Sequence, residues 1–457
     1  MKAHMKVLVL ILVFASTVFL IASGKKEEKP DTVGVKKPNI PTIPQVEVRA
    51  IQEPYYVCSA ASIGLDKGWY EEVGIKIVPE PYGKVVTGGE TVQMLASRNM
   101  DMINQPTMQV LGAIKNLPPI KVFVYDSIFW GSIVLGNPDN FKSVEDFQNE
   151  GLPLNEALRK AVSQIDGKAW GTSGSPGDMS FVKTVLAQAD LTVNDIEVNI
   201  YADPEITAMM LTGQIDVCGG MGLPAVMEMI SKGFKMIVTA SQIAQSAKPS
   251  ADSTELRTVF QVGWTTYDDY IEDNYDTILR FSSVVWRQAR LIDENQEEAI
   301  DIHLPFLNAV SGARNTREQI KQAYEIFDPF FSFEKQERWF TDTSYPLYED
   351  YVLGSYINSW VEDGYLKPGE VKTSDITIAR KVYMDMKNYK ESAEPLIKEA
   401  KALLQEARDQ NKGATEDLNQ TDMLLQKAIS FYDGYDYLDA DRFANAAIEW
   451  ANYNLSQ

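Results

Sequence analysis

The loop at residues 172–178 has the composition of an anion-binding loop. It reads Thr-Ser-Gly-Ser-Pro-Gly-Asp, so its glycines let a ligand approach the backbone closely and its two serines offer hydroxyl donors. A helix that begins there has backbone N–H groups without a partner in the helix, and these attract a carboxylate, sulfonate or phosphate. We therefore predict that Ser173, Gly174 and Ser175 bind a ligand.

The charge of that ligand depends on the role of Asp178, for which two alternatives are open. Its side chain either caps the helix that continues through Phe181, Val185 and Leu186, or it faces the ligand. In the second case the carboxylate favours a cationic or amine-bearing molecule over a simple sulfonate, because opposite charges attract.

Further residues that could contact a ligand lie where apolar, strand-like segments end in loops. They are Tyr55, Tyr56, Tyr82, Lys84, Gln105, Trp130, Met221, Gly222 and Trp264. Aromatic rings at such positions can sandwich a planar molecule, and Lys84 would offer a positive charge to an anion. For any single aromatic side chain of this set, ordinary core packing is the alternative role.

A catalytic site has little support in the sequence. Cys58 lies in the first turn of an expected helix, where the pKa of a thiol can be lowered. A nucleophile also needs a base, and beyond the N-terminal segment the only histidine is His303, far along the sequence. Because an isolated histidine is more often structural, we predict no catalytic residue and no cofactor.

Two glycine-rich segments resemble phosphate-binding motifs without meeting their requirements. Residues 83–90 have the glycine spacing of a phosphate loop, but Gly89 and Glu90 stand where Lys and Ser or Thr are needed. Residues 220–225 fit a dinucleotide fingerprint only formally, because Pro224 interrupts it. No HExxH, paired CxxC or EF-hand pattern occurs in the sequence, so it predicts no metal site.

A repeated unit supplies the elements that would position the candidate residues. A helix rich in Leu and Met, a polar turn and an Asp that opens a short strand occur from Thr91 to Asp101, and again from Thr207 to Asp216 with one residue fewer. A proline-containing loop, a second helix and a second strand follow each copy. The sequence therefore predicts the order helix, strand, helix, strand twice.

Alternating units of this kind predict parallel sheets covered by helices. Strands at 46–51 and 75–79 would complete a first sheet, and strands at 169–172 and 197–201 a second. The chain would cross between the two lobes near 130–136 and return near 240–263. Because such sheets bind ligands beyond the carboxyl ends of their strands, we expect two clefts that face each other.

Over roughly residues 46–370 the chain resembles the taurine, alkanesulfonate and thiamine-precursor family of ABC-transporter solute-binding proteins. The family's opening helix, Lys-Gly-Trp-like turn and Gly-Ile strand match residues 60–77. Its small-residue-then-Asp strand openings match residues 97–101 and 213–216. Residues 166–171 resemble the strand that opens the family's second lobe, with Asp166 as a departure.

The resemblance implies an α/β, two-lobed type II periplasmic-binding-protein fold. Lobe 1 would comprise residues 46–132 and 241–387, and lobe 2 residues 133–240. The implied function is that of an extracytoplasmic solute-binding protein of an ABC importer. It would capture a small organic molecule, such as a sulfonate, a thiamine or pyrimidine precursor or another planar heterocycle, by hinge closure, and deliver it to a membrane permease.

Two alternatives to an importer component stay open on the same fold. One is a ligand-sensing domain that reports to a membrane receptor. The other is an enzyme of the pyrimidine-precursor type, for which His303 would be the histidine at hand.

The N-terminus has the pattern of an export signal. Lys2 and Lys6 precede an apolar run at residues 7–22, and small residues follow the run. Residues 1–24 are therefore expected to be a signal peptide or a signal anchor. The run is shorter than the ~20 residues that cross a bilayer as a helix. Residues 25–44 combine prolines with charged residues and are expected to form a flexible tether. We therefore expect an extracytoplasmic protein, either released or held at the membrane.

The composition of the chain limits the kinds of molecule that the protein is expected to bind. The net charge of -21 argues against nucleic acid, because phosphate binding depends on clustered Lys and Arg. Two cysteines, Cys58 and Cys218, are too few for a disulfide scaffold. We expect both to be unpaired, since a bond between them would lock the hinge.

Residues 388–457 add a C-terminal α-helical extension that the family lacks. One apolar stripe comprises Leu396, Ala400, Leu403, Leu404 and Ala407, and another Phe443, Ala447, Trp450 and Ala451. Breaks at residues 411–413 and 433–434 predict two or three helices that pair as an antiparallel hairpin. The hairpin either packs on its own body or serves as a docking element for a protein partner or a second protomer.

Overall fold

The computed structural model describes residues 36–86, 90–115, 119–174, 176–311, 314–327 and 329–457. Pro38–Gln457 form one compact unit. The expected signal segment, most of the expected tether and Ser175 lie outside the described residues. Within the described part, none of the helices combines the length and the apolar character that crossing a membrane requires.

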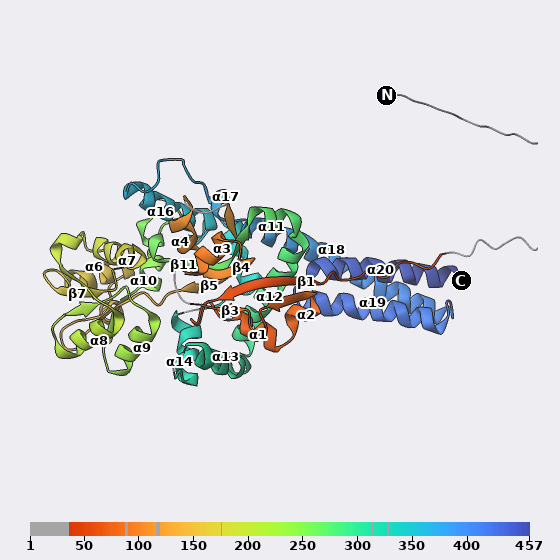
Figure 1. Cartoon of the computed structure of the whole chain (residues 1–457), viewed down its shortest axis with the longest axis horizontal. Helices are drawn as coiled ribbons and strands as arrows, with labels where there is room; N and C mark the ends of the chain where they lie inside the picture. Colours follow the sequence, from red (N-terminus) through yellow and green to blue (C-terminus); the bar gives the residue numbers. More distant parts are fainter. Residues whose placement is uncertain (1–35, 87–89, 116–118, 175, 312–313, 328) are drawn as a thin grey trace, which may run out of the picture. The chain divides into compact units, whose positions relative to one another are not determined.

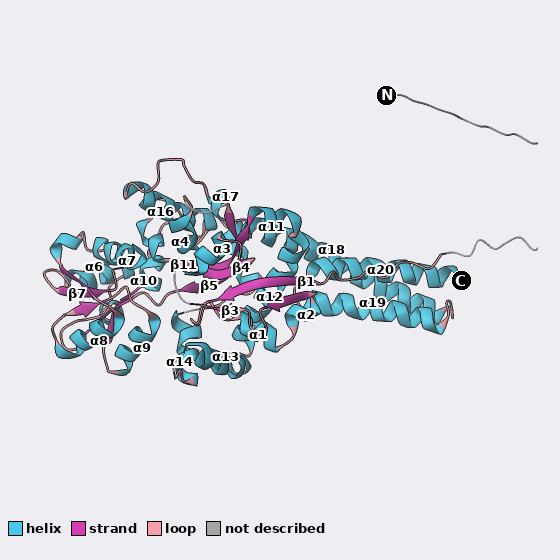
Figure 2. Cartoon of the chain, in the orientation of Figure 1, coloured by secondary structure: helices cyan, strands magenta, loops and turns pink. Residues whose placement is uncertain are grey.

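Six strands form a first sheet, around which we define lobe 1 (Figure 2). Its order is β2 (Ile75–Val78), β1 (Val46–Gln52), β4 (Met102–Pro106), β11 (Phe260–Tyr267) and β5 (Ile120–Phe129), with β3 (Lys84–Val85) also paired to β1. β1 runs parallel to β2, β3 and β4, whereas β11 runs antiparallel between β4 and β5. The strands expected at 46–51 and 75–79 are therefore confirmed.

Five strands form a second sheet, around which we define lobe 2 (Figure 1). Its order is β8 (Glu197–Ile200), β7 (Ala169–Thr172), β9 (Val217–Cys218), β6 (Ile133–Gly136) and β10 (Lys235–Thr239). β7 is parallel to β8 and β9, and β6 runs antiparallel to both β9 and β10.

The two sheets have the same strand order, with β6 in the place of β11. The expectation of wholly parallel sheets is wrong, because each sheet contains one antiparallel strand. That strand is the first one the chain forms after it crosses from the other lobe. The lobe boundaries proposed from the sequence stay predictions, because Pro38–Gln457 form a single compact unit that is not divided into lobes.

The repeated order of helix, strand, helix and strand is confirmed. The first copy is α3 (Glu90–Ala96), β4, α4 (Thr107–Ala113) and β5. The second is α8 (Asp203–Thr212), β9, α9 (Leu223–Ser231) and β10.

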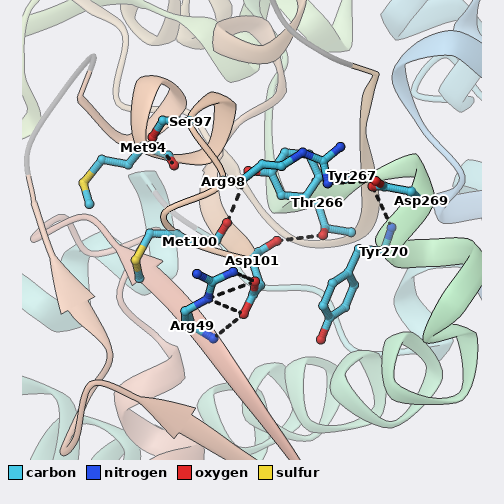
Figure 3. Close-up of polar contacts among 10 residues, drawn as sticks. All are labelled: Arg49, Met94, Ser97, Arg98, Met100, Asp101, Thr266, Tyr267, Asp269 and Tyr270. Carbon is cyan, nitrogen blue, oxygen red and sulfur yellow. Dashed lines mark hydrogen bonds and ion pairs between the residues drawn. The ribbon is translucent and has the colours of Figure 1, made fainter.

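The Asp that opens the repeated strand has the same role in both copies. The N–H of Asp101 donates to Arg49 O at 2.8 Å, and its carboxylate accepts from the Arg49 N–H at 2.9 Å (Figure 3). In lobe 2 the N–H of Asp216 donates to Ala169 O at 2.9 Å, and its carboxylate accepts from the Ala169 N–H at 3.0 Å. Each Asp thus ties its strand to the start of the neighbouring parallel strand.

The turn before each Asp corrects the alignment of the two copies. Arg98 and Gly213 end their helices with positive φ values of 56° and 69°, and each precedes its Asp by the same number of residues. The structure therefore aligns this part of the two copies without a gap, so the pairing of Thr91 with Thr207 is wrong by one residue. Arg98 stacks over the Tyr267 ring at 4.4 Å, and this contact helps to hold its left-handed backbone (Figure 3).

Helices cover both sheets. Those of lobe 2 are α5 (Val144–Asn149), α6 (Leu154–Ser163), α7 (Pro176–Ala187), α8, α9 and α10 (Ala240–Gln245). Lobe 1 has α1 (Ala61–Asp66), α2 (Trp69–Glu72), α3, α4, α11 (Asp268–Asp273), α12 (Tyr275–Glu294), α13 (Gln296–Ser311), α14 (Arg317–Gln322), α15 (Glu337–Thr341), α16 (Glu349–Glu362) and α17 (Thr373–Ile376). The apolar stripe predicted on α12 is buried at Phe281, Val284, Val285, Ala289 and Ile292.

The C-terminal extension is a bundle of three helices, α18 (Ala379–Asp409), α19 (Thr415–Asp433) and α20 (Tyr437–Ser456). Both predicted breaks are confirmed. The boundary expected at residue 388 falls inside α18, which runs without interruption, so the extension continues a helix of the body. A separate apolar core fills the bundle and includes Ala400, Leu404, Leu424, Phe443 and Trp450.

One end of the bundle is built into lobe 1. Tyr437 and Leu438 belong to the same buried apolar cluster as Phe281. Arg280 Nε donates to Asp439 Oδ2 at 2.7 Å, with the two side chains 1% and 2% exposed. The alternative that the extension packs on its own body thus has direct support at this end.

The buried pair yields a stability prediction. Asp439→Asn leaves the Arg280 guanidinium buried without its counter-ion, so we expect a loss of roughly 3 to 5 kcal/mol in the free energy of unfolding. The loss should fall at the lower end, because the buried Asp436 nearby can ionise in its place. Urea unfolding of the variant measures it.

Two further variants make that test specific. Glu449→Gln, at an exposed position on α20, should leave the unfolding free energy unchanged. The double variant Arg280→Met with Asp439→Leu should recover most of the loss, since it removes both charges. Equal stability of Asp439→Asn and the wild type would contradict this role of the pair.

Candidate ligand-binding site

A cavity of about 360 Å³ is lined by residues of both lobes. This volume lies in the range of small-molecule sites, ~300–1,000 Å³. From lobe 2 the lining residues are Asp178, Met221, Gly222, Leu223 and Pro224. From lobe 1 they are residues 53–58, Pro106, Gln109, Phe129, Leu307, Ser311 and Asn315.

The cavity lies where parallel strands end. Residues 53–58 follow β1, and Pro106 is the last residue of β4. In lobe 2 Asp178 lies in the first turn of the helix after β7, and residues 221–224 lead from β9 into α9. The two expected clefts therefore form one cavity, at the carboxyl ends of the strands as the topology predicts.

Five of the residues predicted from the sequence line this cavity: Tyr55, Tyr56, Asp178, Met221 and Gly222. The Tyr55 side chain is 43% exposed, whereas Tyr56 is buried and its hydroxyl donates to Asn315 Oδ1 at 2.6 Å. The structure thus brings together candidates from both lobes, and their role as ligand contacts remains a prediction.

Three further predicted residues do not line the cavity: Trp264 and Gln105 are buried, and Trp130 is partly buried. Trp264 is 2% exposed, because β11 is an inner strand, and its ring packs against Phe281 at 4.7 Å. Gln105 is fully buried on β4. Trp130 stands between the two sheets and packs against the apolar clusters of both, so it belongs to the connection between the lobes.

Tyr82 and Lys84 are also outside the cavity lining. The Tyr82 ring packs edge-on against Phe306 at 4.8 Å. Lys84 is exposed on the short strand β3. The cation proposed for an anionic ligand is therefore absent from the wall.

The loop after β7 satisfies its own polar groups. The Ser173 hydroxyl donates to Asp178 Oδ2, and the Ser173 N–H donates to Gly220 O at 3.1 Å. Gly174 has φ 74°, and a Cβ there would lie 2.7 Å from Ile200. Neither Ser173 nor Gly174 lines the cavity, and Ser175 lies outside the described residues. Asp178 lines the cavity and also lies in the first turn of α7, so both roles considered for its side chain stay predictions.

Asp203 is a residue that the sequence analysis missed. It is the first residue of α8, and its Oδ2 accepts from the Gly222 N–H at 3.0 Å. Burial raises the pKa of Asp203, and the nearby Asp178 charge raises it further, against the lowering effect of the Gly222 bond. A Cβ at position 222 would lie 2.8 Å from Asp203 Oδ2, so a larger residue there would displace that carboxylate.

Glu53 is the second missed residue. It follows β1 directly, is 1% exposed and lines the cavity. The Thr91 hydroxyl donates to Glu53 Oε1 at 3.2 Å, and burial raises the pKa of Glu53 to about 7. A polar residue at the carboxyl end of a buried strand was the signal that could have found it.

The cavity wall carries negative charge. Glu53 and Asp178 contribute carboxyl groups from opposite lobes. Among the described residues of the wall there is no Lys, Arg or His.

His303 is placed as a structural residue. It is fully buried, with Nε2 2.7 Å from the Ser59 hydroxyl and Nδ1 2.5 Å from the Tyr324 hydroxyl. Burial lowers its pKa to about 3, so the imidazole is neutral. It does not line the cavity. Cys58 does line it. Both cysteines are buried, and neither forms a disulfide bond, as expected.

The raised pKa of Glu53 predicts a pH-dependent stability. The folded protein keeps a proton that the unfolded chain releases at pH 4.5, so stability falls as the pH rises from 4.5 through about 7. Glu53→Gln should therefore be the more stable protein above pH 7, by up to about 3 kcal/mol. Below pH 4.5 the two should unfold alike.

Thermal or urea unfolding of both proteins on each side of this pH window measures the effect. The other titratable groups of the wall are unchanged in the variant; they are Tyr55, Tyr56, Cys58 and Asp178. The exposed Glu399→Gln serves as the control and should show no pH-dependent difference from the wild type. A Glu53→Gln protein that is less stable above pH 7 would show that the carboxylate is not destabilising.

The sequence matches no family model and no curated protein. Its structure is similar to that of the periplasmic sulfonate-binding protein SsuA of a sulfonate ABC transporter from Methylobacillus flagellatus KT. The TM-score is 0.52 and the identity 15%, over 75% of this chain and 94% of that one.

Two other similar structures have slightly lower scores. The periplasmic aliphatic sulphonate-binding protein SsuA from Escherichia coli has a TM-score of 0.49 at 12% identity, over 72% of this chain and 91% of that one. The periplasmic nitrate-binding protein NrtA from Synechocystis PCC 6803 has a TM-score of 0.48 at 13% identity, over 77% and 89%. The likeness to the Methylobacillus protein shows that this chain has the α/β, two-lobed fold of the periplasmic binding proteins, to which it adds a C-terminal helical extension.

Proposed function

We propose that the protein is the extracytoplasmic solute-binding component of an ABC importer. It captures a small organic molecule between its two lobes and delivers it to a membrane permease. The observation that carries the proposal is the cavity, whose wall is built from the strand ends of both lobes.

The connections between the lobes support hinge closure. The chain crosses from β5 to β6 through residues 130–132, and it returns after β10 through α10 and η2 (Thr254–Thr258). The Ala240 N–H donates to Ser132 O at 3.0 Å, so the two connections are hydrogen-bonded to each other. A ligand that contacts both walls stabilises the closed arrangement, since it binds that arrangement better than the open one.

The chemistry of the wall supports binding over catalysis. Cys58 is a wall residue, but His303 is held away from the cavity between Ser59 and Tyr324. Glu53 and Asp178 accept hydrogen bonds from the hydroxyls of Thr91 and Ser173, and neither Thr91 nor Ser173 lines the cavity.

The export signal expected at residues 1–24 and the tether expected at 25–44 would place the body outside the cytoplasm, within reach of a permease. The segment before β1 also contacts the extension, because Ile43 packs against the core of the bundle. A role of the extension in binding a protein partner or a second protomer stays a prediction, for which sedimentation is the measurement.

Substitutions on the two walls test the clamp. For a compound that raises the unfolding temperature, Tyr55→Ala on lobe 1 and Met221→Ala on lobe 2 should each weaken binding by about tenfold or more, since each removes apolar contact worth ~1–3 kcal/mol. Calorimetric titration measures the affinity. Met423→Ala, at an exposed position on α19, is the control and should bind as the wild type does.

A ligand whose affinity depends on only one of the two walls would contradict capture between the lobes. Solution scattering adds a second criterion, because closure should reduce the radius of gyration when the compound binds. An unchanged radius of gyration would argue against hinge closure.

A further inference from the structure

We propose that the cavity selects an organic cation, an amine or another positively charged N–H group on an apolar body, and that it rejects sulfonates and other anions. This inference rests on the proposed function, because it names the class of solute that the same cavity binds. It departs from what the names of the similar structures say those proteins bind, sulfonate and nitrate.

The two acidic residues of the wall come from opposite lobes. Glu53 follows β1 in lobe 1, and Asp178 lies in the first turn of α7 in lobe 2. Closure of an empty cavity removes water from both carboxyl groups, which disfavours their ionised forms. A cation bound between the lobes favours those ionised forms, so it stabilises the closed arrangement in particular.

An anion would find no counter-ion in the described wall. Lys84 is exposed on β3. Arg257, beside a different cavity, is engaged by Glu362 through two contacts of 2.8 and 2.7 Å. Burying an unpaired anion next to two carboxyl groups is costly, because desolvation and repulsion act in the same direction.

A helix N-terminus can hold an anion. In lobe 2, however, side-chain carboxylates of the protein already lie at these helix ends. Asp178 lies in the first turn of α7, where it also accepts the hydroxyl of Ser173. Asp203 occupies the Gly222 N–H at the start of α9. Their negative charges offset the partial positive charge of these helix ends, so little of it is left for a ligand.

Apolar and aromatic side chains complete the wall. Tyr55, Tyr56 and Phe129 contribute rings from lobe 1, and Met221 and Leu223 apolar surface from lobe 2. Aromatic faces attract cations as well as apolar groups. The matching solute therefore combines a charged nitrogen with a hydrocarbon or planar part.

The region behind Glu53 is polar and incompletely paired. Thr91 donates to Glu53 and also lies 3.4 Å from Gln105 Oε1. Gln105 is fully buried, and its Nε2 has no hydrogen-bond partner among the described residues. Gln105 does not line the cavity, so this donor belongs to the polar layer behind the wall and not to the ligand contacts.

A matched set of probes tests the charge preference. Phenethylamine, 2-phenylethanol and 2-phenylethanesulfonate share one ring and differ in charge. Each is included in one of three panels, of organic cations, neutral molecules and anions, in a thermal-shift screen. We expect the strongest stabilisers to be cations. Within matched pairs, the cation should bind at least about tenfold tighter than the anion.

Three variants connect that preference with the wall. Glu53→Gln and Asp178→Asn should each weaken binding of the best cation by about tenfold or more, as expected when a partner of a buried charge pair is removed. Glu399→Gln, which changes the net charge equally at an exposed site on α18, should leave the affinity unchanged. Circular dichroism checks that each variant is folded. If Glu53→Gln does not fold, Asp178→Asn alone provides the test.

The outcomes separate this inference from the proposed function. If anions or neutral molecules are the best stabilisers, or if a cation binds equally well to both acid variants, the cation preference is wrong while solute binding stands. If no compound of any panel stabilises the protein, both proposals fail.

Discussion

The insertion of one antiparallel strand into each sheet, directly after the chain arrives from the other lobe, is the constraint on which the ligand site depends. β6 enters the second sheet after the first crossing, and β11 enters the first sheet after the return. Each runs antiparallel between the last two strands of its sheet, so neither sheet is complete without the chain that arrives from the other. The lobes are thereby joined by two connections, and the carboxyl ends of β1, β4, β7 and β9 surround one cavity.

Charge distinguishes this cavity from a generic small-molecule site. Glu53 is buried at a position where its ionised form is unfavourable, and Asp178 contributes a second carboxyl group from the other lobe. Burial disfavours ionisation of Glu53, and we propose that a positively charged solute offsets this cost. The same groups therefore link the stability of the folded chain, the closure of the lobes and the choice of ligand.

The order of helices and strands in the repeated unit was predictable from the sequence, because local signals specified it: the repeated turns before Asp101 and Asp216. The antiparallel direction of β6 and β11 was not, because it depends on where the chain arrives from the other lobe. Side-chain direction was less predictable. Trp264 follows the loop-edge pattern of a ligand contact, yet β11 is an inner strand and buries it. Glu53 and Asp203 were missed because their roles depend on a neighbour distant in sequence, Thr91 for one and Gly222 for the other. The extension illustrates the same limit, since the pairing of Arg280 with Asp439 joins helices that the sequence pattern treats as separate units.

The most direct measurement is a crystal structure of the protein with its most stabilising compound. The account predicts the compound in the cavity, in contact with both lobes, with a positively charged nitrogen within hydrogen-bonding distance of Glu53 and Asp178. A compound bound to one lobe alone, or outside the residues that line the cavity, would contradict it.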